Sequence, residues 1–254
     1  MTPQLSVVII TFNEQKNIRR CLNSIQGIAD EIVVVDSFST DRTQKICEEF
    51  GVRFIQHAFE GHIQQKNFAI AQTSYDWVLS LDADEALSEE LKESIIEAKN
   101  SPNHKGYKMN RLTNYCGTWV KHCGWYPDTK VRLVNKCFAR WQGINPHDRL
   151  DMLRGEKVGF LKGDILHYSY YTHEDHYKQI EYFGDIAARE LYQQGKRIGI
   201  FAVFGKVCAQ FIKSYVLKLG FLDGFTGFTI SRLSAYATYR KYSKLRALYK
   251  NANQ

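Results

Sequence analysis

The chain has 254 residues, of which 44% are hydrophobic and 24% charged, and this composition is typical of a folded globular protein with room for one large α/β domain and an appendage. Its formal net charge of +7 is unevenly distributed, because residues 178–254 carry 13 Lys and Arg against 4 Asp and Glu. A basic segment rich in Phe, Tyr, Leu and Ile indicates an anionic membrane surface as its partner and argues against nucleic acid.

The cysteines and the first residues narrow the class further. The six cysteines form no C-x-x-C pair, which disfavours a zinc site or a disulfide framework and favours reduced thiols. Met1 to Gln4 lead directly into a strand-like run, without the basic and apolar regions of a signal peptide. We therefore expect a cytoplasmic protein.

Strands and helices alternate along the first part of the chain. Apolar, β-rich runs occupy residues 5–10, 31–35, 53–56 and 77–81, and stretches with helical spacing of apolar residues lie between them, the third of these at 65–73. This alternation predicts a doubly wound α/β fold with a mostly parallel sheet flanked by helices. In such folds, ligands bind at the carboxyl ends of the strands.

Acidic residues lie at those carboxyl ends. Glu14 follows the first run, Asp36 the second, and Asp82 and Asp84 the fourth. Two carboxylates at this spacing suit Mg²⁺ or Mn²⁺, which take one or two carboxylates together with water and phosphate oxygens. The alternative is a strand that ends in solvated acids before the next helix, which we expect to begin at Ser88.

No glycine-rich loop follows the first strand, which disfavours a Rossmann dinucleotide site, a P-loop and a glycine-rich nucleotidyltransferase signature. A bound nucleotide would therefore be recognised by side chains. An acid would contact the ribose hydroxyls and a metal ion would contact the phosphates.

Several stretches together carry a family resemblance. In the order and spacing of Val7 to Glu14, Ile32 to Thr43, Gln65 to Asn67 and Leu81 to Glu85, the chain resembles the family-2 glycosyltransferases of GT-A fold. It is similar in particular to the bacterial lipopolysaccharide core β-1,4-glucosyltransferases, on the following further residues: Gly124 to Asp128, Arg132, Leu133, Trp141, and Pro146-His147-Asp148. The resemblance covers residues 5 to about 250.

The resemblance implies a donor site. Thr11 and Glu14 would line the pocket for the base and ribose, and Asp36 would contact the nucleoside. Asp82 would face the ribose, and Lys66 would meet the diphosphate as a point charge. The alternatives are that Glu14 caps the first helix and that Lys66 is a solvated helix residue.

The resemblance also implies a metal site and a role for an arginine. Asp84 would ligate the metal, and His167, at the end of a later strand, would reach the metal or the diphosphate unless it is a core histidine. Arg132 would neutralise developing phosphate charge or pair with Asp128.

The acceptor side is expected in the next part of the chain, where short strands begin near Gly106. Residues 121–128 are rich in aromatic and hydrogen-bonding side chains, which suit the apolar face and polar rim of a sugar ring. Trp125, Tyr126 and Asp128 are the expected acceptor-binding residues. The alternative is an aromatic corner of the core.

An inverting transfer needs a general base that takes the proton of the acceptor hydroxyl. The related branch typically has a Glu after a His at this place, whereas this chain has Asp148 after His147, and the side chain of Asp is one methylene shorter. We predict Asp148 as the base, with His147 as the second candidate.

The C-terminal residues indicate helices. His173-Glu174-Asp175-His176 lacks a supporting third ligand motif for zinc and is more typical of a helix start. A polar-faced helix is expected over 176–194, and residues 198–222 place aromatic residues at helical spacing. Lys206, Lys213 and Lys218 interrupt that segment, so we expect a helix lying in the plane of a membrane rather than crossing it. Packing on the catalytic domain or on a second copy is the alternative.

The sequence therefore predicts a nucleotide-sugar-binding half at 1–105, an acceptor-binding half at 106–175 and a basic amphipathic tail at 176–254. The predicted protein is a metal-dependent, inverting glycosyltransferase, peripheral on the cytoplasmic face of the inner membrane. It would use UDP-glucose and a lipid-linked saccharide such as the lipopolysaccharide inner core. The alternatives are another glycan or lipid-phosphate acceptor, a nucleotide-sugar hydrolase, and a non-catalytic membrane adaptor. A homo-oligomer is compatible with the sequence.

Overall fold

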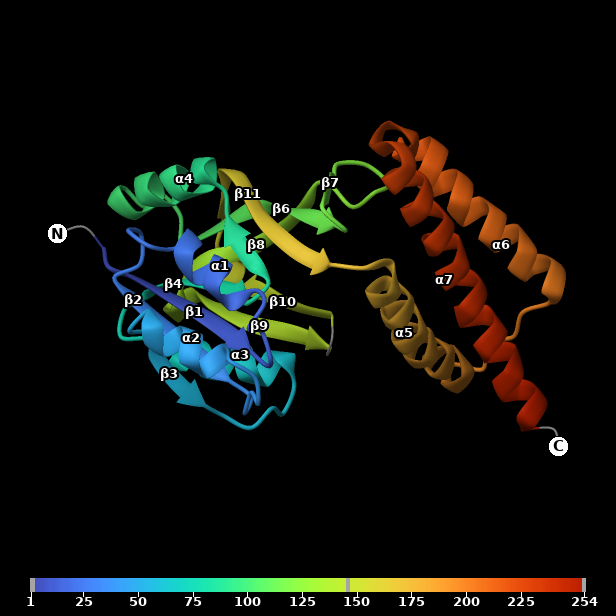
Figure 1. Ribbon diagram of the computed structural model, residues 1–254, viewed down its shortest axis with the longest axis horizontal. Coiled ribbons are helices and arrows are strands. Elements are labelled where there is room, and N and C mark those ends of the chain that lie inside the picture. Colours follow the sequence, from blue (N-terminus) through green and yellow to red (C-terminus); the bar gives the residue numbers. More distant parts are fainter. Residues whose placement is uncertain (1–2, 145–146, 253–254) are drawn as a thin grey trace. The chain divides into compact units, whose positions relative to one another are not determined.

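The computed structural model describes residues 3–144 and 147–252, and Figure 1 shows their helices and strands. The chain forms two compact units. The first unit contains residues 1–112 and 128–168, and the second contains residues 113–127 and 169–254. The sequence suggested divisions after residues 105 and 175, whereas the structure groups residues 113–127 with the C-terminal helices.

The first unit is built on a mixed sheet. Its parallel half consists, in spatial order, of β3 (Arg53–Gln56), β2 (Glu31–Asp36), β1 (Leu5–Thr11) and β4 (Trp77–Asp82). The sheet continues through β8 (Asp128–Asn135), which is antiparallel to β4, and then through β6 (Gly106–Tyr115), β11 (Val158–Tyr170) and β5 (Glu85–Leu87). Next to it, β9 (Ala139–Ile144) and β10 (His147–Met152) form an antiparallel pair. The predicted α/β fold is confirmed.

Both faces of β2, β1 and β4 are buried, which explains the continuous apolar runs of these three strands. Side chains alternate between the two faces of a strand, so Val7 and Ile9 of β1 pack on one side and Val8 on the other. The first layer includes the helices α1 (Ile18–Ser24), α2 (Thr43–Glu49) and α4 (Glu89–Asn100). The second layer includes α3 (His62–Ala71) and β9. The carboxyl ends of the strands therefore meet at one edge, between these two layers.

The helix boundaries have local causes. Ser88 caps α4 as expected, because its hydroxyl accepts a hydrogen bond from the backbone N–H of Leu91 at 3.2 Å. α3 begins at His62 rather than at the expected residue 65, directly after Gly61, whose φ of 136° is a backbone conformation that favours glycine.

Helices make up most of the second unit: α5 (His173–Gln193), α6 (Ile200–Ile212) and α7 (Gly224–Asn251). The short strand β7 (Thr118–Val120) pairs with the last residues of β6. α5 begins with a capping box, in which Thr172 and Asp175 each accept a hydrogen bond from the other's backbone N–H. Among the residues that the structure describes, no group of three or more His, Cys, Asp and Glu side chains is placed to hold a metal ion.

The helix expected over residues 198–222 is shorter in the structure. α6 continues as a π-helical segment over Lys213–Leu217 and stops before Leu219, which has a φ of 54°. Within the described chain, Ile200–Leu217 is the one helical segment long and apolar enough to cross a membrane by length and composition, with a mean hydropathy of 1.5. The segment meets this criterion although it contains Lys206 and Lys213, so it is more apolar than the sequence interpretation assumed.

The core of the second unit is an aromatic cluster beside an ion-pair network. Tyr115 packs with Trp125, Tyr170 and the buried His176, whose ring lies 4.7 Å from that of Tyr170. Burial, and secondarily the neighbouring His173, lowers the pKa of His176 to about 4. The folded unit therefore favours the neutral form of His176 over the protonated form.

Ion pairs join α7 to α5. Arg240 donates to both carboxylate oxygens of Glu181, at 2.6 and 2.7 Å, and Lys244 contacts Glu181 and Asp185. Part of the basic charge of the tail is therefore used inside the unit.

We predict that the stability of the second unit falls below pH 6.5 because of His176. The pKa of this group is depressed in the folded state, so its contribution is present above the unfolded pKa of about 6.5 and is lost as the pH falls toward 4. The loss should approach about 3 kcal/mol at low pH. Urea denaturation between pH 7 and pH 4 should show a shallower pH dependence for His176→Gln than for the unmodified chain. Equal slopes for the two proteins would contradict the assignment.

Candidate active site

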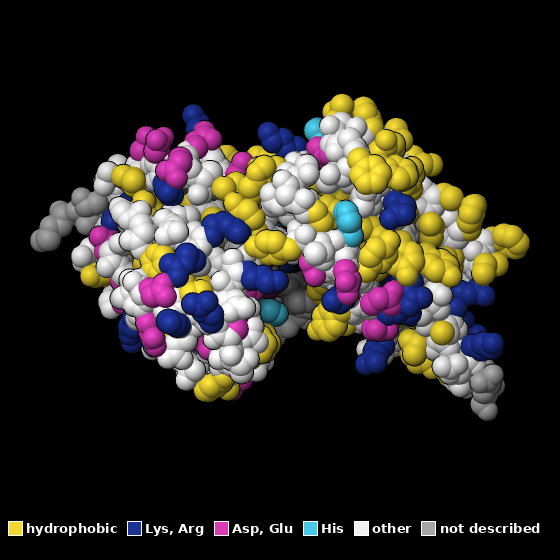
Figure 2. Space-filling view, viewed as in Figure 1, with side chains coloured by type: hydrophobic (Ala, Val, Ile, Leu, Met, Phe, Trp, Pro, Cys, Tyr) yellow, Lys and Arg dark blue, Asp and Glu magenta, His cyan; other side chains and the backbone are white. Residues whose placement is uncertain are grey.

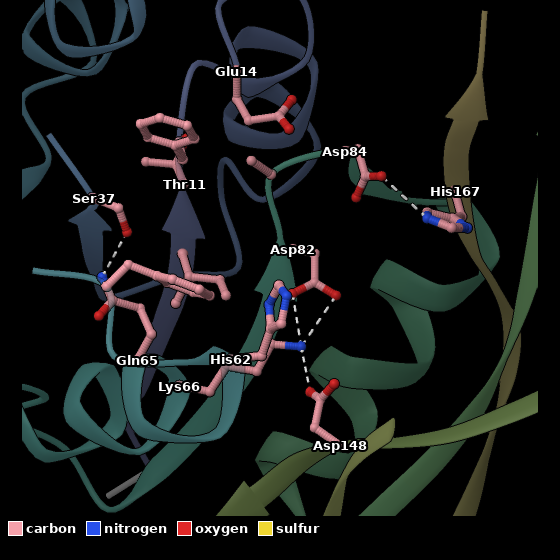
Figure 3. A pocket seen from close by; sticks show the side chains of 14 residues that line it. Thr11, Glu14, Ser37, His62, Gln65, Lys66, Asp82, Asp84, Asp148 and His167 are labelled. Atoms are coloured by element: carbon pink, nitrogen blue, oxygen red, sulfur yellow. Dashed lines mark hydrogen bonds and ion pairs between the residues drawn. The ribbon is translucent and has the colours of Figure 1, made fainter. Parts of the chain in front are cut away.

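A cavity of about 740 Å³ lies at the carboxyl ends of β1 and β4 in the first unit. Figure 3 shows the polar side chains that line it, from β1, the following loop, α3, β4, β10 and β11. The cavity brings together these residues of the sequence prediction: Thr11, Glu14, Lys66, Asp82, Asp84, Asp148 and His167.

Lys66 lies between two carboxylates. Its Nζ is 3.0 Å from Oδ1 of Asp82 and 2.8 Å from Oδ2 of Asp148, and the residue is 5% exposed (Figure 3). The ammonium also lies 4.3 Å from the ring centroid of Trp141. The alternative of a solvated helix lysine is therefore wrong.

Asp82 has a second cationic partner in Arg132, whose Nη2 donates to Asp82 at 3.1 Å and to Glu85 at 2.8 Å. Burial alone would raise the pKa of Asp82, but the charges of Lys66 and Arg132 outweigh it and hold that pKa well below its usual range. Burial likewise opposes the charge of Arg132, yet Glu85 and Asp82 raise the pKa of its guanidinium. Asp82 and Arg132 are therefore both charged at neutral pH.

The alternative in which Arg132 pairs with Asp128 is wrong. The two residues lie on the same strand, four positions apart, so their backbones are separated by about 13 Å. Asp128 is instead the cross-strand partner of Arg111, whose Nη2 lies 2.8 Å from its carboxylate, and Lys130 binds its other oxygen at 2.9 Å. The register of β6 against β8 thus places Arg111, and not Arg132, beside Asp128.

Asp84 and His167 form a pair at the other side of the cavity. Oδ2 of Asp84 lies 3.1 Å from Nε2 of His167, and the backbone N–H of Tyr168 donates to the carbonyl of Asp84 at 2.9 Å. Nδ1 of His167 is buried and has no hydrogen-bond partner among the described residues. A carboxylate and an imidazole side by side suit a divalent cation that takes its remaining ligands from phosphates and water.

Thr11 and Glu14 lie on the opposite wall. Burial raises the pKa of Glu14, and the nearby Asp84 adds to this, although a hydrogen bond of 2.8 Å from Asn17 opposes it. The hydroxyl of Thr11 is buried without a hydrogen-bond partner in the part of the chain that the structure describes. Both groups are therefore suited to contact a polar ligand such as a nucleoside.

Asp36 is placed below the edge of the cavity rather than in its wall. Its side chain is fully buried and accepts hydrogen bonds from the backbone N–H of Ser39, at 2.7 Å, and from the Ser39 hydroxyl. Ser37 lines the cavity instead and accepts a hydrogen bond from Gln65 at 3.1 Å.

The expected acceptor residues are distributed over both units. Trp125 and Tyr126 belong to the second unit, where Trp125 packs in the aromatic cluster, whereas Asp128 belongs to the first. His147 begins β10, and its side chain lies outside the described part of the structure.

The sequence interpretation missed the role of Glu85. Its side chain is fully buried, and its carboxylate accepts hydrogen bonds from Arg132 and, at 2.9 Å, from the backbone N–H of Asp82. The available signal was its position as the third acid after the strand. Gln65 was also missed as a wall residue, although it directly precedes Lys66.

Comparisons with known proteins place the chain in a family. The family model described as Glycosyl transferase family 2 matches residues 6–165. An uncharacterised glycosyltransferase of Rickettsia typhi is 33% identical over 255 residues, covering 96% of this chain and 87% of that protein. The lipopolysaccharide core biosynthesis glycosyltransferase LpsC of Rhizobium meliloti is 25% identical over 264 residues, covering 94% and 93%. Among solved structures, residues 1–349 of S. aureus TarS in complex with UDP share 15% identity at a TM-score of 0.48, covering 99% and 91%.

The chain belongs to glycosyl transferase family 2. It is a glycosyltransferase, and its α/β fold is the GT-A fold that the sequence resemblance implied.

Proposed function

We propose that this enzyme transfers glucose from UDP-glucose to a lipid-linked saccharide, with inversion and with the help of a divalent cation. The observation that carries the proposal is the position of Lys66 between Asp82 and Asp148, in the same cavity as the Asp84–His167 pair. The relative LpsC is described as a lipopolysaccharide core biosynthesis enzyme, which supports an acceptor of that type.

The donor nucleoside would bind near Thr11 and Glu14. The unpartnered hydroxyl of Thr11 and the carboxyl of Glu14 offer hydrogen bonds to its base and ribose, and Asp82 faces the ribose. Asp36 would act through the Ser37 to Ser39 loop that its carboxylate holds.

Asp84 and His167 would hold the cation beside the donor diphosphate. When bound, the cation would neutralise charge on the leaving diphosphate. Lys66 and Arg132 add fixed positive charge in the same region, where burial strengthens electrostatic interactions. Placing charged groups before the reaction is an effective way to stabilise a leaving group, because little reorganisation is then needed.

Asp148 would act as the general base. As the acceptor oxygen bonds to the anomeric carbon, its proton passes to Asp148, and the bond from that carbon to the diphosphate oxygen breaks on the opposite face. Lys66 now pairs with Asp148 and Asp82, and a bound diphosphate would give its ammonium a third anionic partner. Movement of Lys66 toward the diphosphate would leave Asp148 more basic. His147 remains the second candidate.

The second unit would dock on an anionic membrane. Figure 2 shows hydrophobic side chains gathered over α6, and among them Phe201 is 91% and Phe204 71% exposed. One side of the following segment is fixed inside the unit, because Ser214 is 3% exposed and bonds to the hydroxyl of Ser231 at 3.0 Å. A helix with one packed side and one free apolar side fits the plane of a membrane better than a span. Its lysines would meet anionic headgroups.

We predict that the donor stabilises the enzyme only together with a cation. In a thermal-shift panel of UDP-, GDP-, ADP- and CMP-sugars with and without Mn²⁺ or Mg²⁺, UDP-glucose with the cation should raise the melting temperature most, because a ligand of the folded state adds to its stability. Asp84→Asn should abolish the cation-dependent part of this shift. Asp76→Asn, a change of an exposed acid of the same unit, is the control and should retain it. If Asp84→Asn retains the full cation-dependent shift in melting temperature, Asp84 is not a ligand of the metal.

We predict that Asp148→Asn lowers kcat by about 10²–10⁴-fold, because a positioned base contributes this much. Asp148→Glu retains a carboxylate at the end of a longer side chain and should recover much of the rate. Donor-induced thermal shifts should remain in both variants, which separates loss of chemistry from loss of folding. If Asp148→Asn retains its rate and His147→Gln does not, the base is His147.

We predict that the apolar face of α6 binds vesicles. Replacing Phe201 and Phe204 by Ser should weaken flotation with phosphatidylglycerol vesicles by at least about tenfold, since burial of one Phe contributes roughly 1.5–3 kcal/mol. Phe160→Ser, at a Phe of β11 that is 53% exposed, is the matched control in the first unit. Equal flotation of all three proteins, or extraction of the enzyme from cells without detergent, would refute the docking surface.

A further inference from the structure

A second cavity in the first unit has no ligand assigned so far. It has a volume of about 550 Å³ and is lined by residues of β8, β9 and β10 together with Arg111 of β6. Lys66, Asp82 and Asp148 line this cavity as well as the first one. The two cavities therefore share the lysine and both of its carboxylate partners.

The wall of the second cavity contains buried hydrogen-bond donors without acceptors. Nε and Nη1 of Arg132 and Nε1 of Trp141 have no partner among the described residues, and these residues are 3% and 4% exposed. A buried donor without a partner is destabilising by about 1–3 kcal/mol, and by more when the group is charged. All three atoms are donors, so a ligand that satisfies them must bring acceptor atoms.

The donors without a partner, rather than a surplus of charge, favour an anion. The basic side chains of the wall outnumber its acidic ones, with Lys66, Arg111, Lys130, Arg132 and Arg149 against Asp82, Asp148 and Asp151. These basic side chains are already paired: Arg149 with Asp151 at 2.7 Å, Lys66 with Asp82 and Asp148, Arg111 and Lys130 with Asp128, and Arg132 with Asp82 and Glu85 through Nη2. Nε and Nη1 of Arg132 are therefore the charged donors left for a ligand. A guanidinium presents its N–H groups in a planar fork that matches carboxylate and phosphate oxygens.

We propose that the second cavity binds a phosphate or carboxylate group carried by the saccharide acceptor. Arg132 and Trp141 donate to the anion from the buried side, and Lys130 and Arg149 add positive charge. The proposal rests on the proposed function, because it assigns the second cavity to the acceptor of the same reaction. Asp148 lines both cavities, so a hydroxyl of an acceptor anchored in the second cavity reaches the base while the donor occupies the first.

The donor diphosphate also carries phosphate oxygens and could be the anion that binds here. The experiment distinguishes it from an anionic group of the acceptor. Inorganic phosphate is titrated calorimetrically into the full chain saturated with UDP and Mn²⁺, so that the first cavity is filled. Sodium chloride of equal ionic strength is titrated in parallel. Phosphate should bind, and Trp141→Phe, which removes only the indole N–H and part of the ring, should weaken it about fivefold.

Two further variants complete the test. Lys130→Ala should also weaken phosphate binding, and it keeps the proposal testable if Trp141→Phe does not fold. Arg140→Ala is the matched control, because Arg140 is an exposed residue next to Trp141 on β9 and does not line the cavity. It should change phosphate affinity by less than about twofold, as a distant surface charge does. The affinity for UDP-glucose should stay unchanged in Lys130→Ala and Arg140→Ala, and Trp141→Phe should weaken it less than it weakens phosphate.

The proposal is overturned if the unmodified chain does not bind phosphate or if all variants bind it equally. It is also overturned if Trp141→Phe weakens UDP-glucose as much as phosphate, since the anion is then the donor diphosphate. Failure of the proposed function has a different signature, because no nucleotide sugar would then shift the melting temperature. Phosphate binding that depends on Trp141 and Lys130 without any nucleotide would still support an anion site in this cavity.

Discussion

The buried carboxylate of Glu85 is the constraint on which the active site depends. Its side chain is excluded from water, and it accepts hydrogen bonds from the guanidinium of Arg132 and from the backbone N–H of Asp82. A buried charge is tolerated only when it is paired and hydrogen-bonded, so the chain must turn sharply after β4 to bring Glu85 back to Asp82. This turn places Asp84 at the cavity, beside Asp82, which is the last residue of β4.

The same charges extend into a network that fixes several elements of the first unit. Arg132 lies on β8, Lys66 on α3 and Asp148 on β10, and all are joined through Asp82. Removing one partner of a buried ion pair destabilises a protein by about 3–5 kcal/mol, because the other charge is left uncompensated. The elements therefore keep their relative positions. A network of apolar side chains would hold them as well, but it would offer nothing to a diphosphate or to an acceptor hydroxyl.

The sequence predicts the features that depend on local residue pattern. It does not predict the contacts that depend on strand register or on which unit a loop packs in. The apolar runs and the acids after them indicate the parallel half and its carboxyl edge, and Lys66, Asp82, Asp84 and Asp148 do meet there. The partner of Asp128 depends on how β6 pairs with β8, including an irregularity between Tyr107 and Lys108, which no spacing reveals. Trp125 and Tyr126 belong to residues 113–127, which the structure groups with the C-terminal helices. The composition of this segment does not indicate which unit it belongs to.

The wall shared by the two cavities links the ligands that they would hold. Lys66 balances Asp82 and Asp148, so an anion in either cavity competes with these carboxylates for the ammonium. When the ammonium turns toward one ligand, the charge facing the other cavity changes with it. Thermodynamic linkage requires the effect to be reciprocal: if a donor changes the affinity for the acceptor, the acceptor changes the affinity for the donor by the same factor. If Asp148 is the base, as proposed, its release by a diphosphate bound to Lys66 would limit activation of the acceptor to complexes in which a donor is present.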